Sequence, residues 1–411
     1  MLLYSLVNDS DMSISEEAIS LLVKENDHAR ERAIKYPSKR FIFSDLFSTG
    51  RSFIAIAGLR GVGKTTALLQ RLIGNPNSFY VSMDRHTDLE LRELIAELHS
   101  RYGVRELLVD EISYAKKWQA ALKEIYDTTD YKVIFTSSVA LDIVRSKFDL
   151  SRRVIVKQMH PFSLREFVQF TKNKKVDQTK PMDLFDEKKM RLVARMDSYF
   201  EEYSSGGLIP AYLEEKNPQI FANILERILE KDLVFTLNYT GEDVLNVKTM
   251  LQYMANAGVD DVSYSSIARN IGITKYKAIQ YVDALEKAFV LNPVKPTGSN
   301  AVKEPKILFV PPFRRIYVKD KDSPALVGIM REEFFVESMK IAGYVVHYLK
   351  NKRGKKTPDY AVQMNGKKFI FEIGGAQKNR TQLPPSANAF LLTYPAHVQG
   401  VYRPLVWTGL L

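Results

Sequence analysis

The stretch RSFIAIAGLRGVGKTTALLQRLIG, residues 51–74, decides the fold of the first part of the chain. Residues 52–57 form a short apolar, β-rich run that predicts a strand, and helical spacing of apolar residues predicts a helix from Lys64 onward. Residues 58–65 lie between them and match Gly-x-x-x-x-Gly-Lys-Thr, the Walker A pattern of phosphate-binding loops. In such a loop the glycines let backbone N–H groups point at phosphate oxygens, and the helix N-terminus adds its positive dipole end. The sequence therefore predicts a P-loop nucleotide site.

The loop residues have distinct expected roles in binding ATP and Mg²⁺, the two cofactors that the pattern predicts. Lys64 is expected to neutralise the β- and γ-phosphates, which makes it a catalytic residue, and the Thr65 hydroxyl is expected to ligate Mg²⁺. The residues expected to contact the nucleotide are Gly58, Gly61, Val62, Gly63, Lys64, Thr65 and Thr66.

Further β-rich runs alternate with helical segments after the loop, at residues 79–83, 106–109, 131–135 and 154–156. This alternation predicts an α/β fold with a parallel sheet covered by helices on both faces. The run at 106–109 ends in Asp110 and Glu111, at the carboxyl end of a strand, where ligands bind in such sheets. Asp110 is expected to hold Mg²⁺ through water, and Glu111 to polarise the water that attacks the γ-phosphate.

The next predicted strand ends in Thr-Ser-Ser, residues 136–138. Their hydroxyl groups have two interpretations: hydrogen bonds to the γ-phosphate, or a cap for a helix that begins near Val139. The sequence favours neither interpretation.

Several of these segments, in this order, resemble one protein family. They are residues 58–65, LLVDEIS (107–113) followed by Trp118 and KEIYD (123–127), VIFTSS (133–138) and SRRVIVKQMHPFSLREF (151–167). The family is that of bacterial and archaeal AAA-like ATPases of the signal-transducing (STAND) type. The resemblance implies ATP hydrolysis and a helical lid after the sheet. It also places the strand that ends in residues 136–138 between the strands that carry the two motifs.

Two details of the resemblance concern the nucleotide. Gly206-Gly207-Leu-Ile-Pro210 looks like the family's glycine–proline turn, which contacts the adenine from the lid, with one residue inserted. Pro210 is therefore expected to bind the nucleotide. Arg153 matches an arginine that typically follows glycine in the family, where this chain has Arg152. It either senses the γ-phosphate or pairs on the surface.

Residues 263–289, SYSSIARNIGITKYKAIQYVDALEKAF, predict a helix-turn-helix with Gly272 in the turn and Thr274 capping the second helix. β-rich runs at 290–294 and 306–310 follow and predict the wing of a winged helix. The residues expected to point outward, as residues that contact a DNA groove do, are Lys275, Lys277 and Gln280. In relatives such a domain often serves as a lid or protein-contact module, so both roles stay open.

A second candidate site lies in KTPDYAVQMNGKKFIFEIGGAQK, residues 356–378. Asn365-Gly366 is a strong signal for a two-residue hairpin turn, because both central positions of a type I′ turn need positive φ. Counting outward from that turn puts Asp359 directly opposite Glu372. Two like charges about 5 Å apart on paired strands repel each other, whereas a divalent cation between them would make them a chelate.

The family resemblance extends to the C-terminus, which looks like a restriction-endonuclease-like, or PD-(D/E)xK, domain. The resemblance implies that Asp359 and Glu372 grip a divalent cation, which lowers the pKa of bound water and stabilises the leaving phosphate oxygen. Glu332, on a preceding amphipathic helix with Glu333 beside it, is expected to be the third catalytic acid. The run LKNKRGKK, residues 349–356, is expected to contact phosphates.

The lysine expected in such a domain is displaced in this chain. Two residues after the second acid the chain has Gly374, so Lys378 is expected to swing in from a following helix and stabilise developing charge, with Gln382 one turn beyond it. An active nuclease and a domain that binds DNA without cutting it both fit this pattern. An exposed hairpin with an accidental acid pair fits it as well.

A chain of 411 residues is too long for one core. The predicted division is an AAA-like P-loop ATPase domain with an N-terminal helical lead-in at 1–160, a helical lid at 161–240, a winged helix at 241–318 and a restriction-endonuclease-like domain at 319–411. The absence of cysteine excludes disulfides and thiolate metal sites. No apolar run approaches membrane-spanning length, so a cytoplasmic protein without a membrane partner is expected.

The chain is basic, with 59 Lys and Arg against 48 Asp and Glu, a net charge of +11. From residue 311 onward there are sixteen basic and seven acidic residues, so most of the excess lies in the last quarter. This local excess favours a polyanionic partner such as DNA, although a solvated basic surface has the same composition. The leading hypothesis is an ATP-hydrolysing switch that engages, and in its stronger form cleaves, DNA. The alternative is a regulatory ATPase whose inactive nuclease fold contacts protein partners; no oligomeric state is predicted.

Overall fold

The computed structural model describes residues 14–48, 50–138, 150–298, 304–320, 323–349 and 357–411. The chain divides into two compact units. The first unit comprises Met1–Gly58 and Gly63–Met159, and the second comprises Leu59–Val62 and His160–Leu411. The tip of the phosphate loop, Leu59–Val62, therefore belongs to the second unit. Among the described residues, no helix has the length and apolar character needed to cross a membrane.

A five-stranded parallel sheet forms the centre of the first unit, in the order β2-β3-β4-β1-β5. The strands are β1 (Phe53–Ala57), β2 (Ser78–Ser82), β3 (Glu106–Asp110), β4 (Lys132–Ser137) and β5 (Val154–Gln158). Every residue of β1 and β3 is buried, as expected for central strands covered on both faces. The predicted α/β fold with a parallel sheet is confirmed, and β4 lies between β1 and β3 as the family resemblance implied.

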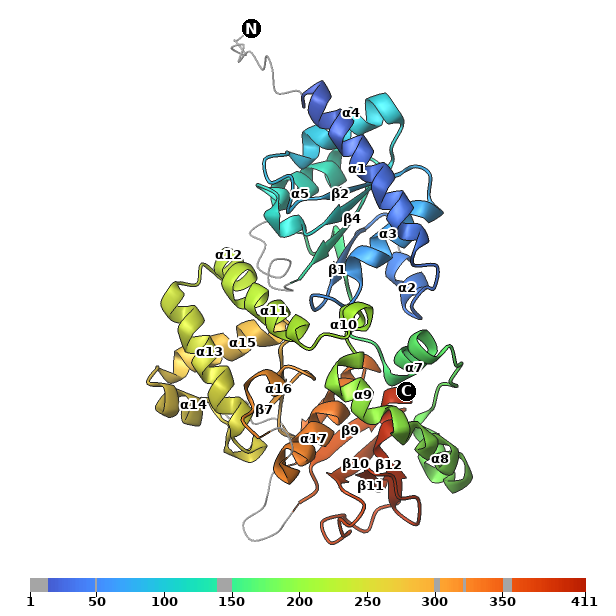
Figure 1. Cartoon of the computed structure of the whole chain (residues 1–411), viewed down its shortest axis with the longest axis vertical. Helices are drawn as coiled ribbons and strands as arrows, with labels where there is room; N and C mark the ends of the chain where they lie inside the picture. The colour runs from blue at the N-terminus through green and yellow to red at the C-terminus, as the bar shows by residue number, and fades with distance from the viewer. Residues whose placement is uncertain (1–13, 49, 139–149, 299–303, 321–322, 350–356) are drawn as a thin grey trace. The chain divides into compact units, whose positions relative to one another are not determined.

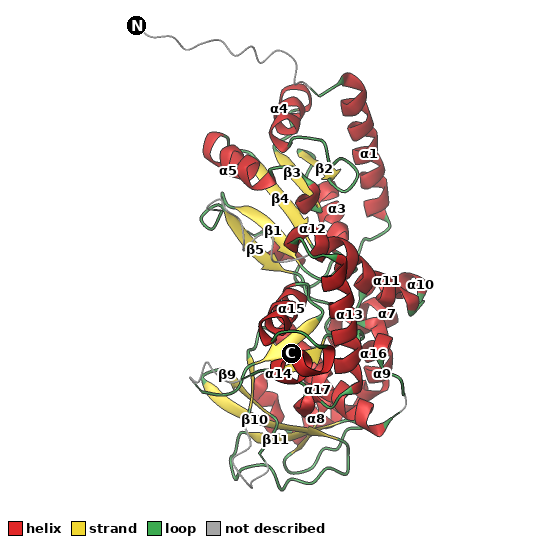
Figure 2. Cartoon of the chain, turned by 90° about the vertical axis from the view of Figure 1, so that its left-hand side faces the viewer, coloured by secondary structure: helices red, strands yellow, loops and turns green. Residues whose placement is uncertain are grey.

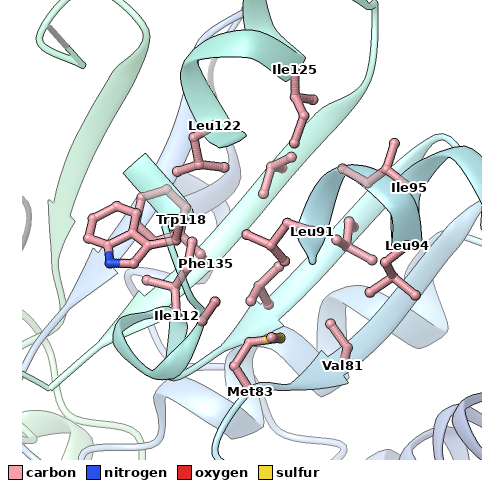
Figure 3. Packing of buried hydrophobic residues seen from close by; sticks show 14 of the residues in the cluster. Val81, Met83, Leu91, Leu94, Ile95, Ile112, Trp118, Leu122, Ile125 and Phe135 are labelled. Atoms are coloured by element: carbon pink, nitrogen blue, oxygen red, sulfur yellow. The ribbon is translucent and has the colours of Figure 1, made fainter. Parts of the chain in front are cut away.

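Helices cover both faces of this sheet (Figures 1 and 2). They are α1 (Glu16–Ile34), α2 (Phe43–Phe47), α3 (Lys64–Gly74), α4 (Leu91–Tyr102) and α5 (Trp118–Thr128), with a helical turn η1 (Ile112–Tyr114). Figure 3 shows Leu91 and Leu94 of α4 and Leu122 of α5 packed over the sheet, beside Trp118 and Phe135. Burying such a side chain stabilises the fold by about 1.5–3 kcal/mol, so this core anchors the strands whose ends carry the candidate site.

Short helices follow in the second unit, over the segment predicted as a lid. Their bounds are α7 (Leu164–Lys172), η2 (Pro181–Phe185), α8 (Glu187–Val193), η3 (Ala194–Tyr199), α9 (Phe200–Glu202), η4 (Tyr203–Gly207), α10 (Pro210–Glu215), α11 (Gln219–Arg227), η5 (Ile228–Asp232) and α12 (Leu233–Leu237). Gly206, in the predicted glycine–proline turn, has φ +150, and a Cβ there would collide with Phe221 Cζ. The turn therefore requires glycine at this position.

Three helices and a two-stranded antiparallel sheet come next. They are α13 (Gly241–Asn256), the turn η6 (Val259–Asp261), α14 (Tyr264–Ile271), α15 (Lys275–Lys287), β6 (Leu291–Val294) and β7 (Lys306–Phe309). Gly272, with φ +74, ends α14, and the Thr274 side chain accepts a hydrogen bond from Lys277 N at the start of α15. Both boundaries agree with the helix-turn-helix predicted from the sequence.

The C-terminal segment carries a second five-stranded sheet, in the order β12-β11-β10-β9-β8. Its elements are α16 (Arg314–Tyr317), α17 (Pro324–Ile341), β8 (Val346–Tyr348), β9 (Tyr360–Met364), β10 (Lys367–Gly374), β11 (Ala389–Thr393), β12 (Tyr402–Pro404) and η7 (Leu405–Leu410). Strands β9 and β10 form the predicted hairpin, with positive φ at Asn365 and Gly366. The register Met364↔Lys367 is confirmed, and it continues to Tyr360↔Phe371, one step before the two acids.

The middle and C-terminal segments belong to the same compact unit. The chain beyond β6 bonds to the edge strand β8: Tyr348 N donates to Lys295 O, and Thr297 N donates to Tyr348 O, both at 3.0 Å. At a second contact, which is buried, Asn292 Nδ2 of β6 donates to Glu337 Oε2 of α17 at 2.7 Å. The division at 318, like those at 160 and 240, stays a prediction.

Candidate functional site

The phosphate loop connects β1 to α3, and its backbone geometry explains its glycines. Gly61 has φ +81 and Gly63 has φ +96, a region that L side chains rarely adopt. Lys64 begins α3 and is buried. Its ammonium donates to Gly58 O at 2.8 Å and to Ser138 Oγ at 3.3 Å. The charged group is thus held at the loop, where the sequence predicts the phosphates.

Asp110, at the end of β3, collects hydrogen bonds from three hydroxyl groups. Thr65 Oγ1 donates to Asp110 Oδ2 at 2.7 Å, Tyr80 OH donates to the same oxygen at 3.1 Å, and Thr136 Oγ1 donates to Oδ1. Burial and the neighbouring Glu111 raise the pKa of Asp110. The two residues predicted to hold Mg²⁺, Thr65 and Asp110, are therefore in direct contact, and added positive charge here would favour the ionised carboxylate.

Glu111 follows with φ +51, an uncommon conformation for a residue with a side chain. Its backbone N–H donates to Thr136 Oγ1 at 2.9 Å, and its carboxylate accepts from Ser138 Oγ at 2.9 Å and 3.2 Å. Because Ser138 also accepts from Lys64, a single chain of hydrogen bonds joins Lys64, Ser138 and Glu111.

Residues 136–138 also have a third role, which the sequence did not predict. Thr136 donates a hydrogen bond to Asp110 and Ser138 donates one to Glu111, so these hydroxyl groups orient the two acids. The only signal for this use was the family's strand order, which puts β4 beside β3. The helix expected near Val139 lies outside the described residues.

Arg153 pairs within the first unit. Its Nε and Nη2 donate to the two carboxylate oxygens of Asp127 at 2.9 Å and 2.8 Å. A two-bond pair fixes the guanidinium plane, so this geometry favours the pairing role over phosphate sensing.

The lid turn contacts the tip of the phosphate loop, within the second unit. Pro210 begins α10, and the next residue donates its N–H to Gly61 O at 3.1 Å. Arg60 at the loop tip forms a two-bond pair with Asp232, at 2.7 Å and 2.6 Å, with both side chains largely buried. The turn predicted to reach the nucleotide is thus bonded to the loop, while a contact of Pro210 with adenine stays a prediction.

This geometry agrees with the match of residues 50–168 to the family model described as AAA domain. Residues 50–168 form an AAA-type P-loop ATPase domain. Domains of this family bind a nucleotide, usually with Mg²⁺, which fits Lys64, Thr65 and Asp110 as the structure arranges them. Residues 197–321 match a second model, described as a domain of unknown function. That match crosses the predicted boundary at residue 240.

The similarity to one protein extends over most of the chain. Uncharacterized protein MJ1637 of Methanocaldococcus jannaschii is 28% identical over 403 residues, which covers 88% of this chain and 85% of that protein. Among solved structures, the Thermotoga maritima RuvB Holliday junction branch migration motor is 15% identical and covers 68% of this chain and 90% of its own, with a TM-score of 0.25. The FIGL-1 AAA domain in complex with ADP is 14% identical and covers 71% and 95%, with a TM-score of 0.27. These TM-scores are too low to support an inference about function.

A second group of charged side chains lies at the open end of the β9–β10 hairpin. Asp359 Oδ2 accepts from Ile373 N at 2.8 Å, and Lys378 Nζ lies 2.5 Å from Glu372 Oε1 and 3.2 Å from Ile373 O. Glu332, on α17, accepts from Tyr360 OH at 2.6 Å. The sequence-predicted acids and lysine therefore meet in one place.

Burial governs the electrostatics of this group. It raises the pKa of Glu332 and of Glu372 to about 7, and the neighbouring Asp359 contributes to both rises. Burial also raises the pKa of Asp359, against the hydrogen bond from Ile373 N. For Lys378 burial alone would lower the pKa, but the bond to Glu372 raises it. Glu332, Asp359 and Glu372 are thus buried close enough to disfavour one another's charged forms, and the Lys378 ammonium partly offsets this effect.

Gly374 explains how a displaced lysine reaches the acids. A Cβ at Gly374 would lie 2.5 Å from Lys378 Cδ and 2.7 Å from Lys378 Cβ, so the lysine stem occupies the space of the missing side chain. The Gln382 amide, with its nitrogen turned toward the acid, donates to Glu372 Oε1 at 3.0 Å and to Thr357 O at 3.1 Å. Lys378 and Gln382 therefore both lie at Glu372, as expected. The helix predicted to carry them is wrong: residues 375–388, between β10 and β11, form turns and bends.

The predicted metal site concerns the oxygen atoms of this group. In the described part of the chain, no group of three or more Asp, Glu or His side chains is arranged to hold a metal ion. Glu332 bonds to Tyr360 rather than completing such a set. The oxygens of Glu372 and Ile373 nevertheless already bind one cationic group, the Lys378 ammonium. A divalent cation held by Asp359 and Glu372 stays a prediction.

The side chains predicted to contact DNA differ in their surroundings: two form ion pairs and one is exposed. Lys275 pairs with Glu304, and Lys277 Nζ lies 2.5 Å from Asp243 Oδ1. That contact holds the pKa of Asp243 well below its usual range. Gln280 is exposed. The basic run at 350–356 lies outside the described residues.

Proposed function

We propose that this chain is an ATP-hydrolysing switch in which Lys64 and Glu111 act on the γ-phosphate. The observation that carries the proposal is the hydrogen-bond chain from Lys64 through Ser138 to Glu111, beside the Thr65–Asp110 contact. The loop N–H groups would bind the phosphates and Lys64 would neutralise their charge. Glu111, oriented by Ser138, would polarise the attacking water.

The test is Mg²⁺-dependent ATP binding and phosphate release by the full chain. Lys64→Ala should lose ATP binding, whereas Glu111→Gln should keep binding and lose turnover. Glu124→Gln is the matched control, because Glu124 is an acid on α5 whose carboxylate pairs at the surface, with Arg92. Full hydrolysis by Glu111→Gln would contradict the role given to Glu111.

We propose further that the second unit engages DNA, through a winged helix at 241–318 and a restriction-endonuclease-like domain at 319–411. Support comes from the three helices and antiparallel strand pair of the middle segment, and from the charge excess after residue 311. Changing Lys352, Arg353, Lys355 and Lys356 to Ala should lower the slope of log affinity against log salt by about 3–4, because each phosphate contact releases counterions. A control set of four exposed lysines, Lys174, Lys175, Lys188 and Lys216, should leave that slope unchanged.

Cleavage is the stronger form of the proposal. Asp359 and Glu372 would hold a divalent cation, which supplies an activated water and stabilises the leaving oxygen. Glu332 would orient the site through Tyr360, and Lys378 would stabilise developing charge on the phosphate. Asp359→Asn and Lys378→Ala should each abolish metal-dependent cutting of linear, branched or single-stranded DNA. A wild-type chain that binds DNA and cuts none of these substrates would leave a DNA-binding domain without nuclease activity.

One observation favours the alternative, a regulatory ATPase that contacts proteins through the middle segment. On α15, Tyr276 is 69% exposed and Ile279 is 38% exposed, one turn apart, while the neighbouring lysines are engaged in ion pairs. An exposed aromatic and aliphatic pair suits a protein surface better than a DNA groove. If Tyr276→Ser and Ile279→Ser leave DNA affinity unchanged and the Lys275→Ala variant does too, α15 is not the groove-binding helix.

A further inference from the structure

Lys306 begins β7 in the middle segment, yet its ammonium lies close to two tyrosines of the C-terminal segment. Its side chain is only 16% exposed, and its Nζ lies 2.7 Å from Asp260 Oδ1, whose side chain is 81% exposed. The same Nζ lies 5.7 Å from the centre of the Tyr360 ring and 6.0 Å from that of Tyr348. Strand β7 contacts α17, the helix that carries Glu332 (Figure 1).

Tyr360 links this lysine to the acids. It directly follows Asp359 in the chain, and its hydroxyl donates to Glu332 Oε2 at 2.6 Å. Lys306 thus lies near the residue that bonds to Glu332, whereas Lys378 pairs with Glu372. In agreement with this placement, Lys306 opposes the burial and the acid–acid repulsion that raise the pKa of Glu332.

We propose that Lys306, on the middle segment, is a resident cation of the C-terminal acid group: its ammonium permanently offsets the negative charge of Glu332, Asp359 and Glu372. The same positive charge weakens the binding of a divalent cation by Asp359 and Glu372. This effect on metal binding rests on the metal site of the proposed function, whereas the resident cation does not. Buried acids close together need a positive partner, and an ammonium that provides it without metal also repels an incoming metal ion. Metal affinity would then depend on the position of β7, which couples the middle segment to the acids.

The first experiment needs no metal. Thermal midpoints of the full chain in EDTA are measured for wild type, Lys306→Met, Glu332→Gln and the double variant. The amide introduced by Glu332→Gln can still accept the Tyr360 hydrogen bond, so this change removes mainly charge. Lys306→Met should lower the midpoint of the wild type at least twice as far as it lowers that of Glu332→Gln. Additive effects would mean that Lys306 is not a charge partner of Glu332 and would overturn the proposal.

The second experiment is calorimetric titration of the full chain with Mn²⁺. Lys306→Met should bind Mn²⁺ about tenfold more tightly than wild type, because it removes a nearby like charge. Lys306→Arg should match wild type, and so should Lys295→Met, a control at an exposed lysine beside β6. Structural damage would weaken binding, so equal or weaker affinity in Lys306→Met overturns the opposition to metal. If no variant binds Mn²⁺ but the coupling with Glu332 is present, the metal site of the proposed function fails and the resident cation stands.

Discussion

Changing Arg314 to Met should unfold the second unit more readily than any surface change. The Arg314 and Glu333 side chains are each 2% exposed, and Nε donates to Glu333 Oε1 at 2.6 Å. Arg314 Nη1 also donates to Met254 O at 2.8 Å and to Ala255 O at 3.0 Å, at the end of α13. One guanidinium therefore joins the middle segment to α17, next to Glu332.

The magnitude follows from what the change leaves behind. Without Arg314, the Glu333 carboxylate keeps only the N–H of Phe309, at 3.1 Å, and two carbonyl groups lose a charged donor. Breaking a buried ion pair by removing one partner costs about 3–5 kcal/mol. Burial already raises the pKa of Glu333 while Arg314 opposes that rise. Protonation of the orphaned acid therefore limits the loss.

The two tryptophans allow the second unit to be observed alone. Trp118 lies in the first unit and Trp407 is fully buried in the second, so Trp118→Phe leaves one indole reporter there. Urea unfolding followed by Trp407 fluorescence should show a loss of about 3–5 kcal/mol for Arg314→Met. The double change Arg314→Met with Glu333→Leu should lose less than half as much, because no buried charge remains.

A matched control is Lys319→Met, an exposed site close to Arg314 in the chain, which should stay within about 0.5 kcal/mol of wild type. The reasoning is refuted if Arg314→Met costs less than about 1 kcal/mol, or if the double change costs as much as the single one. Either result would mean that this ion pair does not join the two segments.

Three other changes give separate tests. Gly374→Ala should destabilise the second unit by about 1–3 kcal/mol in the same urea assay, because its Cβ would displace the stem of Lys378. Asp359→Asn should raise the thermal midpoint of the metal-free chain modestly by relieving a like-charge pair, and should abolish any further rise on adding Mn²⁺. Burial raises the pKa of Asp197 to about 6, so the wild type loses stability as pH rises from the unfolded value toward 6. Asp197→Asn should therefore raise the midpoint at pH 8 but not at pH 4, and an equal gain at both would contradict this.

Local patterns predicted the parts of the fold that depend on residues adjacent in the chain. Gly61 and Gly63 are glycines because the loop needs positive φ, and that requirement is visible as spacing. The hairpin register followed from Asn365-Gly366, because a two-residue turn leaves one way to pair the flanking residues. Lys277 shows what local spacing leaves out. Helical spacing put it on an outward face, and it is exposed, but spacing could not show that Asp243 of another helix pairs with it.

By itself, the sequence determined the phosphate loop, the acids at the end of β3 and the register of the β9–β10 hairpin, because each depends on short-range spacing. Only the tertiary structure decided their partners. Thr136 and Ser138 reach Asp110 and Glu111 because β4 pairs beside β3, across 25 to 27 residues of chain. Lys306 reaches the neighbourhood of Glu332 because β7 packs on α17. Packing decides which charged side chains become partners, because the sequence pattern of one segment does not specify where a distant segment lies in the fold.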